Sequence, residues 1–247
     1  MRWRDIGASG AVLGWIRHGV KIPWRRRRPP PPFNHGTSLR DLPPDQAAFR
    51  DKETARLIDL GVLLPCTNSR WVSRAFLVPK PGGGWRLVID LRTLNTYCDI
   101  KQMKMETLKR LRSIAKENDW MVTFDLKDGF YALGVAPEDR DYFSVNINGQ
   151  IYNLCALPQG WSLSPYIFHK FTYTFIRHLR DPEAADSEGP PDQISRKARR
   201  RWFRRRRRRT GARLLPFADD FALFESSCRA CAKLRDQVFA LLKDLGL

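Results

Sequence analysis

Residues Leu214 to Phe224 read LLPFADDFALF, and this stretch decides the fold. Two short apolar segments, 214–217 and 221–224, flank the adjacent acids Asp219 and Asp220. The pattern predicts two strands with the acids where a hairpin turns. Aspartate pairs are common in turns because the residue tolerates turn geometry. Two carboxylates between apolar strands also repel each other and lose solvation, so the other interpretation is that they hold a cation.

A third acid, Asp125, ends a segment of alternating character. In residues 120–126 the apolar side chains occupy every second position and Asp125 lies on the other face, which predicts a half-buried strand. If this strand lies beside the hairpin, Asp125, Asp219 and Asp220 converge. Three hard oxygen donors with room for phosphate suit Mg²⁺. Two such ions about 4 Å apart serve nucleotidyl transfer, because one activates the attacking 3′-hydroxyl and the other stabilises the leaving pyrophosphate.

The rest of the chain predicts an α+β fold of helices and hairpins. Hairpins are expected at 75–79 with 85–89, and at 142–147 with 151–156, where Asn148-Gly149 is a strong turn signal. Helices are expected over 45–60, over 103–117, from Ser164 onward and after residue 224.

The net charge of +18 is concentrated in two runs. Arg25 to Arg28 supply four positive charges and residues 196–209 supply eleven, which leaves +3 for the remainder. Such runs stay solvated and attract polyanions. We therefore expect residues 1–40 to be a disordered basic, proline-rich tail and residues 181–212 to be a disordered arginine-rich insertion. Each run is interpreted as a solvated loop, a phosphate-binding arm or a nuclear-import signal, and these interpretations are compatible.

The five cysteines are odd in number and scattered, which argues against a disulfide framework and for a reducing compartment. We expect an intracellular protein of the nucleus or cytoplasm, not a secreted one. No stretch approaches the roughly 20 apolar residues of a membrane span, so no membrane partner is expected. Cys228 and Cys231 form a lone pair without a nearby histidine, and we interpret them as helix residues rather than a zinc or redox site.

Four segments of the chain resemble reverse transcriptases, in the order in which that family carries them. They are VPKPGGGWRLVIDLRTLN at 78–95, FDLKDGFY at 124–131, LPQGWSLSP at 157–165 and FADD at 217–220. The resemblance is to the retroviral and LTR-retrotransposon branch. Residues 104–108 (KMETL) look most like DIRS-type retrotransposons, with gypsy-like elements as the next candidates.

The resemblance implies a polymerase with fingers and palm, in which helices flank an antiparallel palm sheet. Residues 41–118 would form the fingers and the N-terminal palm elements, and residues 119–180 the palm. Residues 213–247 would complete the palm with the Asp-Asp hairpin and a helix. Because the chain stops at Leu247, we expect the thumb to be absent.

The resemblance also implies a role for each carboxylate and an identity for the metal. Asp125 and Asp219 would be the main metal ligands and catalytic residues, with Asp220 beside them. The cofactors would be two Mg²⁺ or Mn²⁺ ions. Phe217 stands where the family more often has tyrosine, so the ring is kept and the hydroxyl is lost.

Five further residues would bind the incoming nucleotide. Arg86 and Lys80 would grip the triphosphate, since a guanidinium suits bidentate phosphate contact. Phe130 would exclude a ribose 2′-hydroxyl and so favour dNTPs. Gln159 would lie beside the nucleotide and template, and Gly160 would allow close approach of the backbone.

Each of these residues also has a plain structural interpretation. On that interpretation Arg86 is a strand surface residue, Lys80 a turn residue, Phe130 a core residue and Gln159 a loop cap. Trp85 and Trp161 are interpreted as packing residues and not as base-stacking platforms.

The function implied is an RNA-directed DNA polymerase domain of a retroelement, a nucleotidyltransferase that adds dNTPs to a primer 3′-hydroxyl. Its partners would be an RNA template, a DNA primer and dNTPs. The alternative is a truncated, inactive remnant that binds nucleic acid nonspecifically through its arginine runs. Such binding would fall steeply with salt because counterion release drives it.

Overall fold

The computed structural model describes residues 2–101, 103, 106, 108–181, 211–217 and 220–247. The chain divides into two compact units, and each is described by itself. Unit 1 comprises Met1–Leu13, Met103–Gly129 and Ile167–Leu247, and unit 2 comprises Gly14–Gln102 and Phe130–Tyr166. Both units are thus assembled from segments that are far apart in the sequence.

Unit 1 is built on a three-stranded antiparallel sheet. Its order is β6 (Trp120–Asp125), β10 (Asp220–Glu225) and β9 (Arg213–Phe217), so β10 lies between the other two. The strands predicted at 120–126, 214–217 and 221–224 are therefore confirmed. The helices are α1 (Arg2–Asp5), α5 (Leu108–Ile114), α6 (Ser164–Arg180) and α8 (Cys228–Leu245), and the first turn of α6 falls in unit 2.

Aromatic side chains join the sheet of unit 1 to its two long helices. Phe124 of β6 stacks on its cross-strand partner Phe221 of β10, with ring centroids 5.1 Å apart. Phe175 of α6 lies 5.5 Å from Phe221, and Phe239 of α8 lies 5.3 Å edge-on from Phe124. Both helices therefore pack on the same face of the sheet. Phe221 and Phe175 are fully buried, as large aromatic core residues should be.

Helix α8 begins and ends at residues suited to those positions. The Ser227 hydroxyl accepts a hydrogen bond from the Ala230 N–H at 3.2 Å, and Gly246 takes the left-handed conformation (φ 80°) after the last turn. Cys228 is exposed and Cys231 is buried in this helix, so the interpretation of both as helix residues is confirmed.

Unit 2 contains a five-stranded sheet and a separate hairpin. The sheet order is β1 (Phe33–Asn34), β3 (Trp71–Ser73), β7 (Ser144–Ile147), β8 (Gln150–Leu154) and β2 (Leu63–Cys66). The hairpin pairs β4 (Ala75–Pro79) with β5 (Trp85–Ile89). The helical segments are α3 (Pro44–Asp59), α4 (Arg92–Asn95), η2 (Gly129–Ala132) and η3 (Pro137–Tyr142).

The predicted hairpins of unit 2 are both confirmed. The β7–β8 turn places Asn148 at φ 52° and Gly149 at φ 95°, the two left-handed positions that an Asn-Gly turn supplies. The helix predicted over 45–60 is confirmed as α3. The helix predicted over 103–117 is seen as the shorter α5, and residues 104, 105 and 107 of that range lie outside the described residues.

The predicted disordered tail over residues 1–40 is wrong. The first part of it is folded into unit 1, because Trp3 of α1 stacks on Phe171 with centroids 4.4 Å apart and donates its indole N–H to the Leu245 carbonyl at 3.1 Å. Arg2 pairs with Asp244 beside it. Further on is α2 (Gly10–His18), which buries Val12.

The following part of the same segment is folded into unit 2. Val20 bridges to Val135, and the buried Asp139 carboxylate accepts a hydrogen bond from the Ile22 N–H at 2.7 Å. Arg25 to Arg27 form the short helix η1. Five apolar residues of this segment are buried, namely Trp3, Ile6, Val12, Val20 and Ile22. The arginines dispersed among them masked this apolar pattern in the sequence.

The predicted domain ranges do not coincide with the two units. The range 41–118 contributes to both, and 119–180 is divided because residues 130–166 belong to unit 2. The insertion predicted at 181–212 lies almost wholly outside the described residues. Its two ends meet, since the Ala212 N–H donates to the Leu179 carbonyl at 2.9 Å.

Candidate active site

Asp125 and Asp220 are direct cross-strand partners at one end of the unit 1 sheet. Strand β10 pairs with β6 in antiparallel register from Asp220–Asp125 to Glu225–Trp120. Residues opposite each other in such a pair have Cβ atoms about 5 Å apart. The structure therefore brings together two of the three predicted metal ligands. The third, Asp219, lies outside the described residues.

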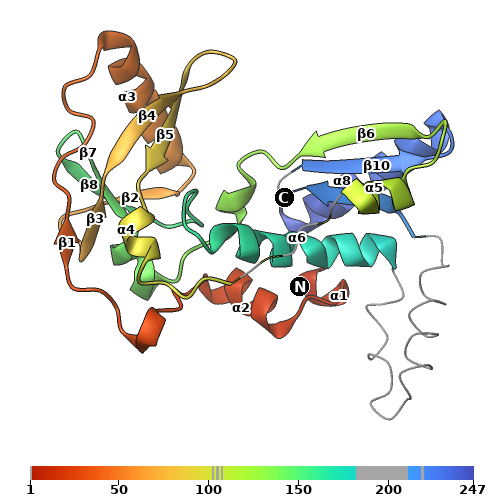
Figure 1. Cartoon of the computed structure of the whole chain (residues 1–247), viewed down its shortest axis with the longest axis horizontal. Helices are drawn as coiled ribbons and strands as arrows, with labels where there is room; N and C mark the ends of the chain where they lie inside the picture. Colours follow the sequence, from red (N-terminus) through yellow and green to blue (C-terminus); the bar gives the residue numbers. More distant parts are fainter. Residues whose placement is uncertain (1, 102, 104–105, 107, 182–210, 218–219) are drawn as a thin grey trace. The chain divides into compact units, whose positions relative to one another are not determined.

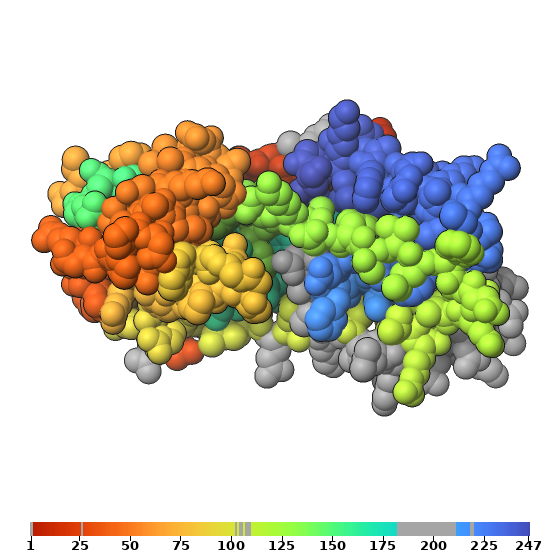
Figure 2. Space-filling model, turned by 90° about the horizontal axis from the view of Figure 1, so that it is seen from above, coloured from red at the N-terminus to blue at the C-terminus, as the bar shows by residue number. Residues whose placement is uncertain are grey.

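The aromatic neighbours decide which way these carboxylates point. Successive side chains of a strand project to opposite faces, and Phe124 and Phe221, which precede and follow the acids, point into the core. Asp125 and Asp220 therefore lie on the opposite, exposed face of the sheet. Strand β6 is an edge strand of this sheet, and its segment lies at the surface alongside β10 in Figure 2.

Neither carboxylate is neutralised by a residue that the structure describes. Within the part of the chain that the structure describes, Asp125 and Asp220 make no hydrogen bond and no ion pair. Like charges directly opposite each other destabilise a sheet. Two exposed, unpaired carboxylates side by side are also the donor set that a hard divalent cation requires. The residues present therefore fit a divalent metal site.

The predicted triphosphate-binding residues lie on the β4–β5 hairpin of unit 2. Arg86 is exposed in β5 opposite Val78, and Lys80 is exposed at the turn, where its backbone pairs with Gly84. Because strand side chains alternate, Val78 and Lys80 project on the same face as Arg86. The hairpin thus presents two cations on one face. Their location relative to the carboxylates of unit 1 stays a prediction.

A loop containing Gln159 and Gly160 lies at the end of the same hairpin. Gly160 has φ 92°, a left-handed conformation that favours glycine, and a Cβ there would lie 3.4 Å from the Ile89 carbonyl oxygen. Gln159 is exposed beside it. The close approach of the Gly160 backbone to a nucleotide stays a prediction.

Asn95 holds this loop and was missed by the sequence analysis. Its side-chain amide donates to the Gly160 carbonyl at 3.0 Å and accepts from the Ser162 N–H at 2.9 Å. Between these contacts, Trp161 is buried and donates its indole N–H to the Cys98 sulfur at 3.4 Å. Trp161 is therefore a packing residue, as predicted. Trp85 is half-buried and donates to Asp45 at 3.1 Å.

Phe130 is half-buried in the short helix η2. The residue before it, Gly129, is buried in unit 1, where a side chain would lie 2.9 Å from the ring of Phe168. The backbone leading to Phe130 is thus held by a contact that excludes any side chain at 129. The role of Phe130 as a gate for the sugar stays a prediction.

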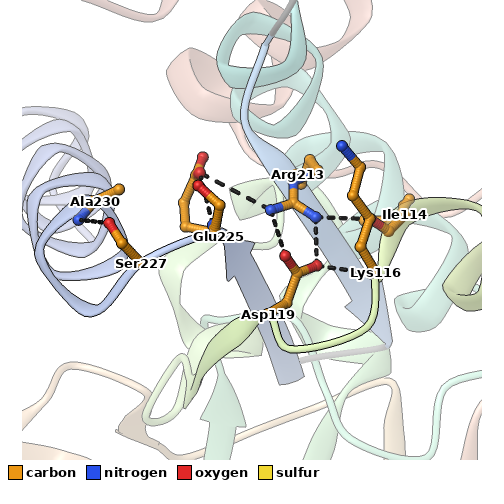
Figure 3. A network of polar contacts seen from close by, with 8 residues as sticks. Ile114, Lys116, Asp119, Arg213, Glu225, Ser227 and Ala230 are labelled. Atoms are coloured by element: carbon orange, nitrogen blue, oxygen red, sulfur yellow. Dashed lines mark hydrogen bonds and ion pairs between the residues drawn. The ribbon is translucent and has the colours of Figure 1, made fainter.

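Two of the ion pairs that lower a carboxyl pKa lie beside the strands described above. The Arg92 guanidinium beside Asp90, just after β5, lowers the pKa of that carboxyl to about 2. Arg213 at the start of β9 lowers the pKa of Asp119 through a bidentate contact. Arg213 also faces Glu225 and the Ile114 carbonyl, and Figure 3 shows this cluster.

None of the helices in the described part of the chain combines the length and apolar character that a membrane crossing requires. The described residues likewise contain no cluster of three or more acidic, cysteine or histidine side chains placed to hold a metal. Asp219 is not among those residues.

Comparison with known proteins gives viral polyproteins as relatives. The chain is 32% identical over 154 residues to the Pol polyprotein of Feline endogenous virus ECE1, covering 58% of this chain and 14% of the relative. It is 36% identical over 131 residues to the Gag-Pro-Pol polyprotein of Sheep pulmonary adenomatosis virus, covering 49% and 7%. The chain therefore spans only a small part of the length of these relatives.

Solved structures share the fold of this chain. Prototype Foamy Virus Protease-Reverse Transcriptase superposes with a TM-score of 0.64 at 22% identity, over 90% of this chain and 25% of that protein. The foamy viral protease-reverse transcriptase in complex with an RNA/DNA hybrid superposes with a TM-score of 0.61 at 20% identity, over 90% and 26%. The predicted α+β fingers–palm fold is thus confirmed.

The sequence profile of one family covers most of the chain. The family described as "Reverse transcriptase (RNA-dependent DNA polymerase)" matches residues 78–247, a span that includes Arg86, Asp125, Gln159 and Asp220. The viral relatives confirm the retroviral or LTR-like branch, while the DIRS-type or gypsy-like subgroup stays a prediction. The chain belongs to the reverse transcriptase family.

Proposed function

We propose that this chain is the fingers and palm portion of an RNA-directed DNA polymerase that adds dNTPs to a primer 3′-hydroxyl. One observation carries the proposal: Asp125 and Asp220 face each other across β6 and β10 on the exposed face of the sheet, without a partner among the described residues. Such a pair is unfavourable unless a cation lies between the carboxylates.

The proposed cofactors are two Mg²⁺ or Mn²⁺ ions held mainly by Asp125 and Asp219, with Asp220 beside them as the third carboxylate. When bound, such ions activate the attacking hydroxyl and neutralise charge on the phosphates. The contribution of the protein is placement. The Phe124–Phe221 stack and the six-residue register fix two carboxylates on rigid strands, and strand positions hold functional groups more accurately than loops do.

Residues of unit 2 are proposed to bind the nucleotide and template. Arg86 and Lys80 supply two exposed cations for the triphosphate, and Phe130 is the gate against a ribose 2′-hydroxyl. Gln159 lies on a loop whose backbone is held by Asn95. Two of the solved structures that share the fold are complexes with dsDNA and with an RNA/DNA hybrid, which supports a primer–template duplex as the partner.

Primer extension tests this proposal. The purified chain is mixed with an RNA template, an annealed DNA primer, dNTPs and Mg²⁺ or Mn²⁺. Extension should occur in the parent and be lost in Asp125→Asn, Asp219→Asn and Asp220→Asn. Asp59→Asn is the matched control, because Asp59 is an exposed acid at the end of α3. Extension that survives Asp125→Asn, or none in the parent with either metal, would reject the proposal.

A second function is favoured by the charge distribution. Fifteen positive charges lie in the two arginine runs, and Arg25, Arg27 and Arg28 are exposed without an acidic partner in the described part of the chain. An inactive chain that binds nucleic acid nonspecifically through these runs would show no extension. Its binding would fall steeply with salt and would disappear after deletion of 196–209 and replacement of Arg25 to Arg28 by glutamine. Retention of polymerase activity after both changes would reject it.

A further inference from the structure

We infer that Arg213, together with Asp119 and Glu225, is a positioning cluster that sets the register of the three strands on which the metal ligands lie. This inference rests on the proposed function of Asp125 and Asp220. The cluster takes one residue from the end of each strand. Arg213 is the first residue of β9, Glu225 is the last residue of β10, and Asp119 directly precedes β6.

Beyond the backbone pairing of the strands, one guanidinium makes the side-chain connections described between these strand ends. The two terminal nitrogens of Arg213 bind both oxygens of Asp119, one contact measuring 2.8 Å. One of these nitrogens also donates to the Ile114 carbonyl at the end of α5, at 3.2 Å, and the other lies 3.9 Å from a Glu225 oxygen. Asp119 accepts a further hydrogen bond from the Lys116 N–H at 2.6 Å, as Figure 3 shows.

The side chains of the cluster are partly or fully buried, and the contact between Arg213 and Asp119 has a fixed geometry. The side chain of Asp119 is 6% exposed, and those of Arg213 and Glu225 are 21% and 29% exposed. A planar guanidinium that fits a carboxylate with two parallel hydrogen bonds fixes orientation as well as distance, which a lysine ammonium does not. The Asp119 end of β6 is therefore held at one place relative to β9.

The cluster and the metal ligands lie at opposite ends of the same paired strands. Asp119 precedes Asp125 by six residues, and Asp220 precedes Glu225 by five. The register runs without interruption from Trp120–Glu225 to Asp125–Asp220. Because side chains alternate with a period of two, a slip of one residue would turn Asp125 toward the aromatic core and away from Asp220. By fixing the register, the cluster at the far end of the strands keeps the Asp125 and Asp220 side chains on the same face of the sheet.

A second buried ion pair in unit 1 provides a matched comparison. Arg180 binds Glu106 through two contacts of 2.6 and 2.7 Å, with both side chains about 15% exposed. Glu106 lies on none of the strands, so this pair does not join β6 to β10. Its loss should lower stability without altering the register of those strands.

The register is tested by trapping it with a disulfide. Thr123 and Ala222 are cross-strand partners on the carboxylate face, so the double variant Thr123→Cys/Ala222→Cys reports correct pairing when it is oxidised. The yield of the 123–222 bond is read by peptide mapping, which separates it from bonds of the native cysteines. We expect Arg213→Lys and Glu225→Gln to lower this yield severalfold and Glu106→Gln to leave it unchanged.

Binding of Mn²⁺ alone, measured by electron paramagnetic resonance, is the second readout. We expect Arg213→Lys to weaken Mn²⁺ binding severalfold, because a slipped register would separate Asp125 from Asp220, and Glu106→Gln to leave it unchanged. Unchanged disulfide yield and unchanged Mn²⁺ affinity in both folded Arg213→Lys and Glu225→Gln would overturn the inference. Loss of Mn²⁺ binding in the parent would instead reject the proposed function, since the disulfide yield does not depend on metal.

Discussion

Asp125 and Asp220 are cross-strand partners, and the residues beside them, Phe124 and Phe221, are stacked 5.1 Å apart on the opposite face of the same two strands. One pairing register thus produces an apolar face and an anionic face. The stacked rings stabilise the register, and the facing carboxylates oppose it in the absence of a cation. Ring stacking and carboxylate repulsion can therefore be changed separately, by substitution on one face or on the other.

Neutralising one carboxylate should stabilise the protein that contains no metal. Asp125→Asn and Asp220→Asn each remove a like-charge contact, so we expect the free energy of unfolding without metal to rise by about 0.2–1 kcal/mol. Denaturation in the presence of a chelator measures this. Added Mn²⁺ should raise the melting temperature of the parent and not of the variants. Destabilisation of both variants in chelator would contradict the interpretation of Asp125 and Asp220 as an uncompensated pair.

Removing the ring of Phe221 should strongly destabilise unit 1. Phe221 is 1% exposed and contacts Phe124 and Phe175, so Phe221→Ala should cost about 3–5 kcal/mol in the free energy of unfolding. Met121→Ala is the control, because Met121 is 58% exposed on β6 and should change stability by less than about 0.5 kcal/mol. Similar losses in the free energy of unfolding of both variants would show that the Phe124–Phe221 stack is not a main source of the stability of unit 1.

Gly19 should be required for the N-terminal segment to join unit 2. It has φ 78°, and a side chain would lie 2.5 Å from the Ala136 nitrogen, so Gly19→Ala should destabilise by more than about 1 kcal/mol. Gly14 in α2 has open space around it. Gly14→Ala should therefore raise the free energy of unfolding by about 0.4–1 kcal/mol, because alanine lowers the conformational entropy of the unfolded chain. Chemical denaturation measures both, and a neutral Gly19→Ala would contradict the folded segment.

Residues 182–210 should be removable without loss of the fold. The Ala212 N–H donates to the Leu179 carbonyl, and Arg180 donates to the Leu214 carbonyl at 3.0 Å, so the two ends of the segment are already held together. A short glycine–serine linker in place of 182–210 should leave the melting temperature unchanged. Affinity for single-stranded RNA should become less dependent on salt, because eleven positive charges are lost. A large fall in melting temperature would show that the segment is part of the fold.

Stability should depend on pH through Asp139 in the direction opposite to that of most carboxylates. Burial raises the pKa of Asp139 despite the hydrogen bond from Ile22. The native state then binds a proton more tightly than the unfolded state, so this contribution is largest below the ordinary carboxyl pKa and is lost as the pH rises through the native value. Asp139→Asn should therefore remove a decline in stability above about pH 4.

Glu138 provides the internal comparison for that experiment. Lys21 lowers the pKa of Glu138 through a hydrogen bond, so its contribution is present at higher pH and is lost as the pH falls. Glu138→Gln should change the free energy of unfolding at acid pH, where the Glu138 contribution is lost. Asp139→Asn should change it at higher pH, where the Asp139 contribution is lost. Identical pH profiles for both variants would contradict the assignment of opposite shifts.

Local patterns in the sequence determined the secondary structure around the candidate site. Alternation over 120–126, the apolar flanks of Asp219-Asp220 and the Asn148-Gly149 turn each act over a few residues, and the corresponding strands and turn are found where they were predicted. Such signals are reliable because side-chain direction and turn geometry are fixed by the residue and its neighbours.

Only the tertiary structure shows which strands pair and which distant residues come into contact. Nothing within 120–126 indicates that Asp125 pairs with a residue 95 positions later, because strand pairing depends on long-range packing such as the Phe124–Phe221 stack. The same holds for Asn95, which grips the Gly160 loop, and for Arg213, which joins three strand ends. The folded N-terminal segment was missed for a related reason. A few buried residues such as Trp3 hold it, and their partners lie in segments distant in sequence.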